Sequence, residues 1–281
     1  MTIVRQNLDL KRALSKERQL DQLLSGIEAA LVAFSGGVDS AFLLSKAIEV
    51  IGREHVLAVT VNSVLNQPQE SAGAADLARE MQARHLVLEV DPLKDETFTS
   101  NSSERCYYCK RNIYGRLLEI SADEGLEVVL DGTNADDPQD HRPGLRALEE
   151  LGIRSPLLEV SLSKEEIRAL AQQGGLPVWD KPAAACLASR FPYGEKITEQ
   201  NLRMVAEAES YLLNLGVKQN LRVRCHGKLA RIEVNRSEEK IILTRREAIV
   251  TKLQELGFAY VTIDLCGFES GSMNRLLPRS G

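Results

Sequence analysis

The sequence of 281 residues has no apolar run long enough to cross a membrane. Its apolar stretches, such as LVAF at 31–34 and VLAVTV at 56–61, are the size of a β-strand, which argues against a membrane-spanning helix. The first 20 residues alternate charge with leucine and lack the apolar block of a signal peptide. We therefore expect a cytoplasmic protein.

Other absences narrow the class of protein further. The five cysteines are odd in number and unevenly spaced, which does not suggest a secreted disulfide framework. The net charge of −5 argues against a general nucleic-acid binder. Residues 1–154 carry 17 Lys and Arg against 25 Asp and Glu, and the remainder carries 18 against 15. The mildly basic second part suits either a small anionic ligand or an ordinary solvated surface.

Strand-like and helix-like segments alternate along the first part of the chain. Strands of this kind, separated by helices, predict a parallel sheet covered on both faces, and hence an α/β fold. Ser163 and Glu166 are spaced as a capping box for a further helix, which Gly174 and Gly175 would end. Beyond a proline-rich stretch the pattern becomes helix, two strands, a helix over 237–256 and a strand. We expect two domains, residues 1–180 and a smaller α+β domain of residues 181–281.

The hexapeptide SGGVDS, residues 35–40, stands between the first strand and the next helix. Backbone N–H groups of such a loop and the positive end of the helix form an anion site, and glycines at 36 and 37 would let phosphate approach closely. Ser35 and Ser40 offer hydroxyl groups, and Asp39 could hold Mg²⁺. The loop lacks the lysine of a Walker motif.

SGGVDS resembles the signature of the PP-loop ATP pyrophosphatases. That resemblance implies cleavage of ATP between its α and β phosphates, with AMP passed to an oxygen of the substrate. It implies nucleotide contacts from the loop and from the ends of two further strands. The residues concerned are Ser35, Gly36, Gly37, Asp39, Ser40, Asn62, Ser63, Asp131, Gly132 and Thr133.

Longer stretches narrow the resemblance. RCYYCKRNIYGRL (105–117), DGTNADDPQDHRPGLRAL (131–148), ACLASRFPYGEKIT (185–198), VRCHGKLARIEV (223–234) and GFESGSMN (267–274) are similar to the LarE family along nearly the whole chain. That family consists of sulfur transferases for the nickel-pincer cofactor of lactate racemase. The resemblance implies a small anionic substrate, pyridinium-3,5-biscarboxylic acid mononucleotide, whose carboxylates are adenylated and become thiocarboxylates. It also implies a homo-oligomer.

Three cysteines are the candidate sulfur carriers. Cys186 lies in a small-residue stretch with Lys181 and Arg190 nearby in sequence, and a thiolate is a strong nucleophile toward an acyl-adenylate. In the simplest family members the cysteine at this position gives up its own sulfur and becomes dehydroalanine. Cys106 and Cys109 add a C-x-x-C pair. By resemblance to tRNA-thiolating relatives, the leading hypothesis is a 4Fe–4S cluster on Cys106, Cys109 and Cys186.

Other interpretations of the C-x-x-C pair stay open: a redox dithiol or persulfide carrier, half of a zinc site, or an ordinary pair at a helix start.

Cys225 and Cys266 are predicted to be packing residues. Lys110, Arg111 and Arg142 are possible contacts for pyrophosphate.

Arg222 and Arg224 are two residues apart on a predicted strand, so their side chains leave the same face and could clamp a phosphate or carboxylate. Arg190 is a third candidate for the substrate, and Glu209 and Glu233 could support these arginines. The rival hypotheses are a tRNA-thiolating enzyme, an ammonia-dependent adenylating synthetase, and a nucleotide sensor without catalysis. The acidic charge counts against the first of these.

Overall fold

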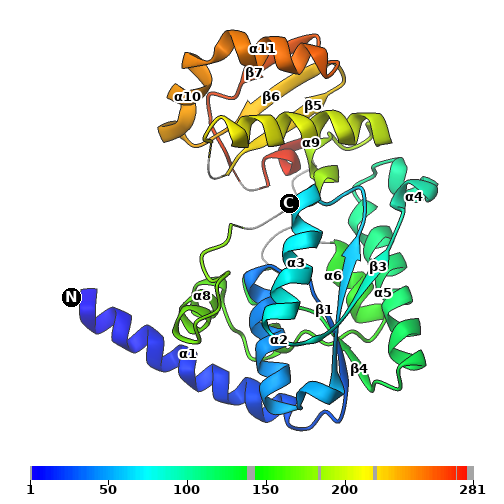
Figure 1. The fold of residues 1–281 in the computed structure, drawn as a ribbon, viewed down its shortest axis with the longest axis vertical. Helices are drawn as coiled ribbons and strands as arrows, with labels where there is room; N and C mark the ends of the chain where they lie inside the picture. The colour runs from blue at the N-terminus through cyan, green and yellow to red at the C-terminus, as the bar shows by residue number, and fades with distance from the viewer. Residues whose placement is uncertain (1, 138–142, 183–184, 218–219, 270, 277–281) are drawn as a thin grey trace. The chain divides into compact units, whose positions relative to one another are not determined.

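The computed structural model describes residues 2–137, 143–182, 185–217, 220–269 and 271–276 (Figure 1). Its internal contacts divide the chain into two units. Unit 1 comprises Met1–Ser63, Pro68–Val90 and Cys106–Ala183. Unit 2 comprises Val64–Gln67, Asp91–Arg105 and Ala184–Gly281. Two short segments from the first half of the chain thus belong to unit 2, whereas the sequence pattern predicts one boundary near residue 180.

The four-stranded sheet of unit 1 is parallel throughout, in the order β3-β2-β1-β4. This confirms the predicted α/β class. Its strands are β1 (Ala30–Ala33), β2 (Val56–Asn62), β3 (Arg84–Glu89) and β4 (Val128–Leu130). The central strand β1 is apolar and almost wholly buried because helices cover both faces of the sheet. Its residues alternate between two cores, with Val32 in one and Leu31 in the other.

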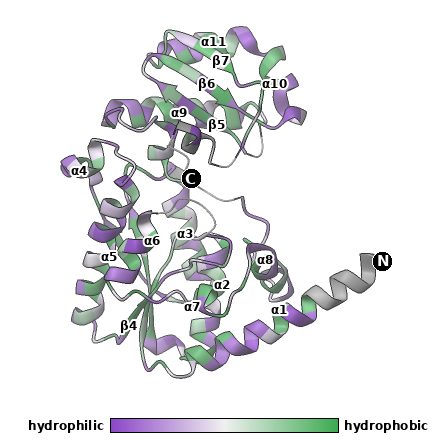
Figure 2. Cartoon of the chain, turned by 180° about the vertical axis from the view of Figure 1, so that it is seen from behind, coloured by the Kyte–Doolittle hydropathy of each residue, from purple (hydrophilic) through white to green (hydrophobic). Residues whose placement is uncertain are grey.

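Helices of unit 1 pack on both faces of this sheet (Figure 1). One core contains residues of α1, α2, α3 and α8, and the other contains residues of α5 and α6. Figure 2 shows hydrophilic and hydrophobic residues side by side on the coloured part of α1. Among the described residues, no helix has the length and apolarity needed to cross a membrane. The helices are α1 (Thr2–Leu24), α2 (Val38–Val50), η1 (Arg53–His55), α3 (Pro68–Glu80), α5 (Arg105–Asp123), α6 (Pro143–Glu150), α7 (Pro156–Glu159) and α8 (Lys164–Gln173).

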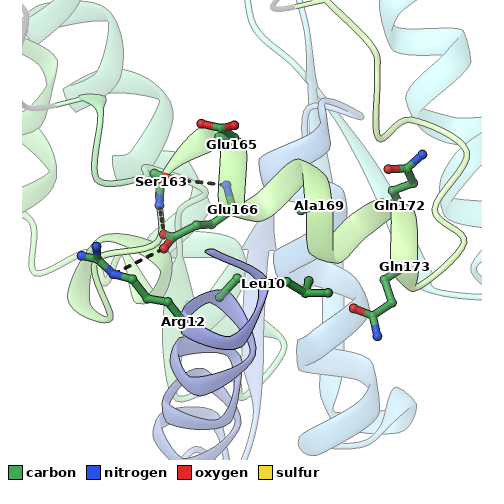
Figure 3. A pocket seen from close by; sticks show the side chains of 9 residues that line it. Leu10, Arg12, Ser163, Glu165, Glu166, Ala169, Gln172 and Gln173 are labelled. Atoms are coloured by element: carbon green, nitrogen blue, oxygen red, sulfur yellow. Dashed lines mark hydrogen bonds and ion pairs between the residues drawn. The ribbon is translucent and has the colours of Figure 1, made fainter. Parts of the chain in front are cut away.

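The predicted capping box at the start of α8 is confirmed. Ser163 Oγ accepts a hydrogen bond from the backbone N–H of Glu166, whose carboxylate accepts one from the N–H of Ser163. Glu166 also pairs with Lys16 of α1 at 2.5 Å. A groove of about 630 Å³ lies between these two helices (Figure 3). None of the site residues predicted from the sequence lines this groove, so we do not assign it to the substrate.

Unit 2 contains a three-stranded sheet in the order β5-β6-β7. β5 and β6 are antiparallel, whereas β6 and β7 are parallel. The single helix predicted over 237–256 is wrong, because α10 ends at Thr244 and α11 starts at Arg246. The hydroxyl of Thr244 donates to the carbonyl of Lys240, a bond that competes with the helical pattern. The elements are η2 (Pro92–Lys94), α4 (Glu96–Thr99), η4 (Leu187–Arg190), α9 (Glu199–Asn214), β5 (Arg222–His226), β6 (Leu229–Glu233), η5 (Arg236–Glu238), α10 (Glu239–Thr244), α11 (Arg246–Glu255), β7 (Tyr260–Ile263) and η6 (Ser272–Leu276).

Candidate functional site: a phosphate loop and a cysteine turn

The SGGVDS loop joins the carboxyl end of β1 to the first turn of α2. Gly36 has φ +68°, a left-handed conformation that favours glycine. A Cβ on Gly36 would lie 2.9 Å from both Cα and Cβ of Ala74 in α3, so this position also requires close backbone approach. Gly37, at φ −82°, is the N-cap of α2. The geometry is that of a compact loop that leads into a helix N-terminus, where an anion is favoured.

The two serines of the loop bond to each other and to the backbone of the loop. Ser35 Oγ and Ser40 Oγ are 3.1 Å apart, and Ser40 Oγ donates to the carbonyl of Gly37 at 3.1 Å. The backbone N–H of Ser35 donates to Ser40 Oγ at 3.2 Å. Ser40 therefore braces the loop, in addition to the ligand contact expected from the sequence.

Asp39 lies on the first turn of α2 and forms an ion pair with Lys164, the first residue of α8. Burial raises the pKa of Asp39, and the pairing with Lys164 offsets this only in part. Its second oxygen, Oδ1, is buried and accepts no hydrogen bond from the described residues. Mg²⁺ binds carboxylate oxygens, and a buried carboxylate oxygen without a hydrogen bond is suited to be such a ligand. Asp39 thus meets the requirement for the predicted magnesium ligand.

The predicted second nucleotide loop follows β4. Asp131 is buried, and its carboxylate accepts hydrogen bonds from the backbone N–H of Thr133 at 2.8 Å and from the hydroxyls of Thr133 and Tyr114. Burial alone would raise the pKa of Asp131, but Lys110 and these hydrogen bonds outweigh it and lower the pKa. A Cβ on Gly132 would lie 3.1 Å from the backbone nitrogen of Ser40. Glycine at 132 therefore lets this loop approach the start of α2.

Asn62, at the end of β2, has its side chain engaged within the fold. Its Nδ2 donates to both carboxylate oxygens of Glu89, at 2.9 and 3.0 Å, and its Oδ1 accepts from Ser71 Oγ at 2.7 Å. Ser63 follows directly after the strand. A nucleotide contact at the end of β2 would therefore use backbone groups, or would require the Asn62 side chain to exchange partners.

Two lysines next to the loop were not predicted as loop contacts. Lys164 Nζ reaches Asp39, and its backbone N–H donates to Asp136 Oδ2 at 2.8 Å. Lys181 Nζ donates to the carbonyl of Gly36 at 2.9 Å. The only sequence signal for Lys164 is its place at the start of a capped helix. For Lys181 the sequence indicates only that it is near Cys186.

The C-x-x-C pair lies on the first turns of α5, with Cys106 exposed and Cys109 half-buried. Gly144 of α6 is close to this turn, since its Cβ would lie 3.4 Å from the carbonyl oxygen of Cys106. Lys110 is 3.8 Å from Asp131, and Arg111 donates to the hydroxyl of Tyr107 at 3.4 Å. Arg142, also predicted to contact pyrophosphate, lies outside the described residues.

Cys186 belongs to unit 2 and is exposed at the N-cap of η4. Arg190, at the end of the same turn, is 2% exposed. It makes a bidentate pair with Glu209, with both N···O distances at 2.8 Å, and also donates to the carbonyl of Cys186 at 3.1 Å. The predicted support from Glu209 is therefore present, but the guanidinium faces the protein interior.

Arg224 is similarly enclosed. It pairs with Glu233 at 2.7 and 3.0 Å and donates to Ser272 Oγ at 3.1 Å. Arg222, two residues earlier on β5, lies over the ring of Phe268 at 5.2 Å. Burial, and then the charges of Arg190 and Arg224, lower the pKa of Arg222 to about 10. The three arginines thus belong to unit 2, and each of them donates to groups of the protein itself, Arg222 to the carbonyl of Leu221 at 2.7 Å.

The remaining cysteine predictions have mixed outcomes. Cys225 is fully buried on β5, and burial raises the pKa of its thiol to about 11, so its predicted packing role is confirmed. The same prediction for Cys266 is wrong, because that residue is exposed beyond the end of β7. Across the described ranges, no group of three or more His, Cys, Asp and Glu residues is arranged to hold a metal ion.

The parallel sheet and the loop between β1 and α2 define a PP-loop nucleotide-binding protein. A family profile for NAD synthase matches residues 19–122. The pyridinium-3,5-bisthiocarboxylic acid mononucleotide synthase of Lactiplantibacillus plantarum is 41% identical over 95% of this chain and 96% of its own length. An uncharacterised protein of Synechocystis is 40% identical over 94% of this chain and 99% of its length.

A third relative, an uncharacterised protein of Methanocaldococcus jannaschii, is 33% identical over 84% of this chain and 88% of its length. Because the chain is 41% identical to the Lactiplantibacillus plantarum synthase over 95% of its length, it belongs to the LarE family.

Proposed function

We propose that this protein is an ATP-dependent sulfur transferase of nickel-pincer cofactor synthesis, which converts the carboxylates of pyridinium-3,5-biscarboxylic acid mononucleotide to thiocarboxylates. The observation that carries the proposal is the constrained SGGVDS loop in a chain 41% identical to a synthase of the corresponding bisthiocarboxylic acid. The relative's name supplies the substrate class, and the loop supplies the means of activating a carboxylate.

Activation would take place at the loop of unit 1. A substrate carboxylate oxygen attacks the α-phosphorus of ATP, the bond to the β-phosphate bridging oxygen breaks, and pyrophosphate leaves. Backbone N–H groups of the loop and the start of α2 would bind phosphate oxygens. Asp39 would hold Mg²⁺, which neutralises phosphate charge when bound. Activation is necessary because a free carboxylate has no good leaving group, whereas an acyl-adenylate releases AMP.

Sulfur would then be delivered through Cys186. Its thiolate attacks the acyl carbon of the adenylate and AMP leaves, so that a thioester joins the substrate to the protein. Removal of the α-proton of Cys186 breaks its Cβ–S bond, which yields a thiocarboxylate and leaves dehydroalanine. The exposure of Cys186 supports this role, because a nucleophile must be accessible.

The C-x-x-C pair is the basis for proposing repeated turnovers. A 4Fe–4S cluster on Cys106, Cys109 and Cys186 would supply an iron with an open coordination position. The exposed and half-exposed thiols of the first two residues, one turn apart on α5, support this proposal.

The anionic substrate would bind with help from Arg222. Arg190, Arg222 and Arg224 face two carboxylates, Glu209 and Glu233, so this part of unit 2 carries an excess of positive charge. Arg190 and Arg224 pair with these carboxylates. Arg222, whose guanidinium lies over the ring of Phe268, would take the phosphate or a carboxylate of the substrate.

The test is to incubate the anaerobically purified protein with ATP, Mg²⁺ and the dicarboxylate mononucleotide. We expect AMP, pyrophosphate and a product in which sulfur replaces oxygen. Two measurements separate the sulfur sources. Loss of sulfur from Cys186 by intact-mass analysis indicates sacrifice, whereas about four irons per chain by iron determination, lost in Cys106→Ser, indicate the cluster. Pyrophosphate release that depends on ammonia and survives Cys186→Ala would contradict the proposal.

The proposal also includes the oligomeric state of the protein and its location in the cell. We propose a homo-oligomer, to be tested by light scattering on the purified protein, and a cytoplasmic location, to be tested by cell fractionation. A monomer at all protein concentrations would contradict the first, and recovery in the membrane or secreted fraction would contradict the second.

A further inference from the structure

The turn that carries Cys186 is one short 3₁₀ helix, η4, with its first two residues buried. Leu187 is 1% exposed and Ala188 is fully buried, whereas Cys186 itself is exposed. Its backbone bonds include those from the N–H of Ser189 to the carbonyl of Cys186 at 2.9 Å and from the N–H of Phe191 to the carbonyl of Ala188 at 3.4 Å. A turn with so few bonds of its own is fixed further by other donors to its carbonyls.

Three guanidinium groups supply the donors. Arg190 donates to the carbonyls of Ala185 at 2.6 Å and Cys186 at 3.1 Å, and to Ser189 Oγ at 3.0 Å. Arg105 donates to the carbonyl of Ala188 at 2.9 Å.

The third group comes from β5. Arg224 donates to the carbonyl of Ser189 at 2.9 Å. In total, four of the five backbone carbonyls of residues 185–189 accept a hydrogen bond from one of these three arginines. All three arginines belong to unit 2, as does the turn itself.

The side chains of these three arginines are themselves buried and bonded to other side chains. Their exposed fractions are 6% for Arg105, 2% for Arg190 and 4% for Arg224. Glu209 fixes Arg190, Glu233 fixes Arg224, and the side-chain oxygen of buried Asn101 accepts from Arg105. A guanidinium fork with fixed donors is well suited to hold backbone oxygens in one geometry.

Asn101 also bonds to the chain that follows the turn. It is fully buried, and its Nδ2 donates to the carbonyls of Pro192 at 2.7 Å and Glu195 at 3.0 Å. Arg105 and Asn101 together therefore fix the chain on the carboxyl side of the turn. On the other side, the backbone N–H of Leu187 donates to the carbonyl of Leu65 at 2.9 Å.

We propose that Arg105, Arg190 and Arg224 are positioning residues that hold the backbone around Cys186 so that its thiol meets the activated carbonyl in one orientation. The inference rests on the proposed role of Cys186 as the sulfur donor. It gives Arg190 and Arg224 a role different from the substrate contact expected from the sequence. Arg105, which the sequence did not single out, bonds to the turn directly through the carbonyl of Ala188.

Orientation affects sulfur transfer but not activation. Attack on an acyl carbon requires the reacting atoms to lie about 3–3.5 Å apart and aligned, and a misplacement of about 1 Å can lower the rate about 100-fold. Adenylation takes place before the thiol is needed. A loosened turn should therefore slow formation of the thiocarboxylate while release of pyrophosphate continues.

The experiment compares Arg105→Leu and Arg105→Lys with the wild type in the full chain. Arg203→Leu serves as the matched control, since it removes an exposed arginine that pairs with Glu199 and does not contact the turn. Three quantities are measured: the single-turnover rates of pyrophosphate release and of thiocarboxylate formation, and hydrogen–deuterium exchange of the peptide that spans Cys186. The thermal midpoint of each variant shows whether it folds.

For Arg105→Leu we expect pyrophosphate release within about twofold of the wild type, transfer slowed by about tenfold or more, and faster exchange around Cys186. Arg105→Lys, which keeps one donor, should recover part of the transfer rate. Arg203→Leu should match the wild type in all three. Exchange or transfer unchanged in Arg105→Leu would overturn the inference, as would an equal slowing of both reactions.

Failure of the proposed function can be recognised separately. If the wild type forms no thiocarboxylate, the role of Cys186 is wrong, and the hydrogen–deuterium exchange still decides whether Arg105 holds the turn. Faster exchange confined to the Cys186 peptide supports the structural part of the inference, and equal exchange overturns it. If Arg105→Leu does not fold, the Arg105→Lys variant is judged on the same three quantities.

Discussion

Lys164 and Asp39 are 125 residues apart in the sequence, yet the ammonium of the first pairs with the carboxylate of the second beside the SGGVDS loop. The pair joins the start of α8 to the start of α2, both within unit 1. Lys164 neutralises the carboxylate that we propose as the Mg²⁺ ligand. With Mg²⁺ on Asp39, the same lysine would be able to attract phosphate oxygens of ATP.

We predict that Lys164→Gln weakens ATP binding by about 10- to 100-fold, because a charge-assisted hydrogen bond to phosphate is worth about 1.5–3 kcal/mol. Without nucleotide, the variant should gain more thermal stability from Mg²⁺ than the wild type does, since Asp39 has lost its counter-ion. Calorimetric titration and thermal melts measure the two effects.

Lys16→Gln is the control for this prediction. It also removes an ammonium that pairs with a residue of α8, Glu166, but the pair lies between α1 and α8. It should leave ATP affinity and the response to Mg²⁺ unchanged. Equal ATP affinity in Lys164→Gln and the wild type would show that Lys164 serves Asp39 alone.

Gly36→Ala should impair both folding and nucleotide binding. The left-handed conformation costs a non-glycine residue about 1–2 kcal/mol, and the new Cβ would also press on Ala74 at 2.9 Å. Gly125→Ala is a control for strain alone, since it has φ +66° and no atom within 4 Å of its Cβ. Urea unfolding should show a larger loss for Gly36→Ala, and only that variant should lose ATP affinity. Equal losses with intact binding would contradict the assigned contact.

The parallel sheet and the loop were predictable because their signals are local. An apolar strand followed by SGGVDS contains both the burial pattern and the glycines that the turn requires. The capping box of α8 is local in the same sense, because Ser163 and Glu166 are three residues apart. Where both partners lie within one short window, composition and spacing are enough.

The partners of the charged residues were harder to predict. The sequence suggests Glu209 and Glu233 as supports for the arginines, and Arg224 does pair with Glu233. Arg105 instead contacts a turn 83 residues away, and spacing carries no signal for that contact. An arginine looks the same in sequence whether it faces solvent or a buried carbonyl. The sequence predicts Cys266 as a packing residue at the end of a strand, but β7 ends at Ile263 and the cysteine is exposed.

Asp131 should make stability depend on pH. Its pKa is lower in the folded protein than its ordinary value, so the ionised carboxylate adds stability above about pH 4, and this is lost as the pH falls through the folded pKa. Asp131→Asn should therefore be less stable than the wild type at neutral pH, with a difference that shrinks in acid. Urea unfolding over a pH series measures it.

Tyr114→Phe provides the comparison, since it removes one donor to Asp131 and leaves the charge. It should cost about 1 kcal/mol at neutral pH, less than Asp131→Asn costs. If the cost of Asp131→Asn is the same at every pH, the charge of Asp131 does not contribute to stability.

Substitution of Arg222 should change how strongly anions stabilise the folded protein. Its pKa of about 10 means that the folded protein disfavours its charge, first through burial and then through Arg190 and Arg224. A bound phosphate would relieve that repulsion and so stabilise the folded state. In buffer without multivalent anions, Arg222→Met should change the unfolding free energy by less than about 1 kcal/mol, because methionine keeps the packing on Phe268.

Added phosphate should then raise the thermal midpoint of the wild type by more than that of Arg222→Met, which keeps only the anion site of the SGGVDS loop. Arg203→Met, which alters an exposed arginine of α9, should respond to phosphate as the wild type does. Sulfate should act like phosphate, since both offer oxygens that match a guanidinium. An equal rise in all three proteins would mean that phosphate binds elsewhere, and Arg222 would lose its place as the substrate contact.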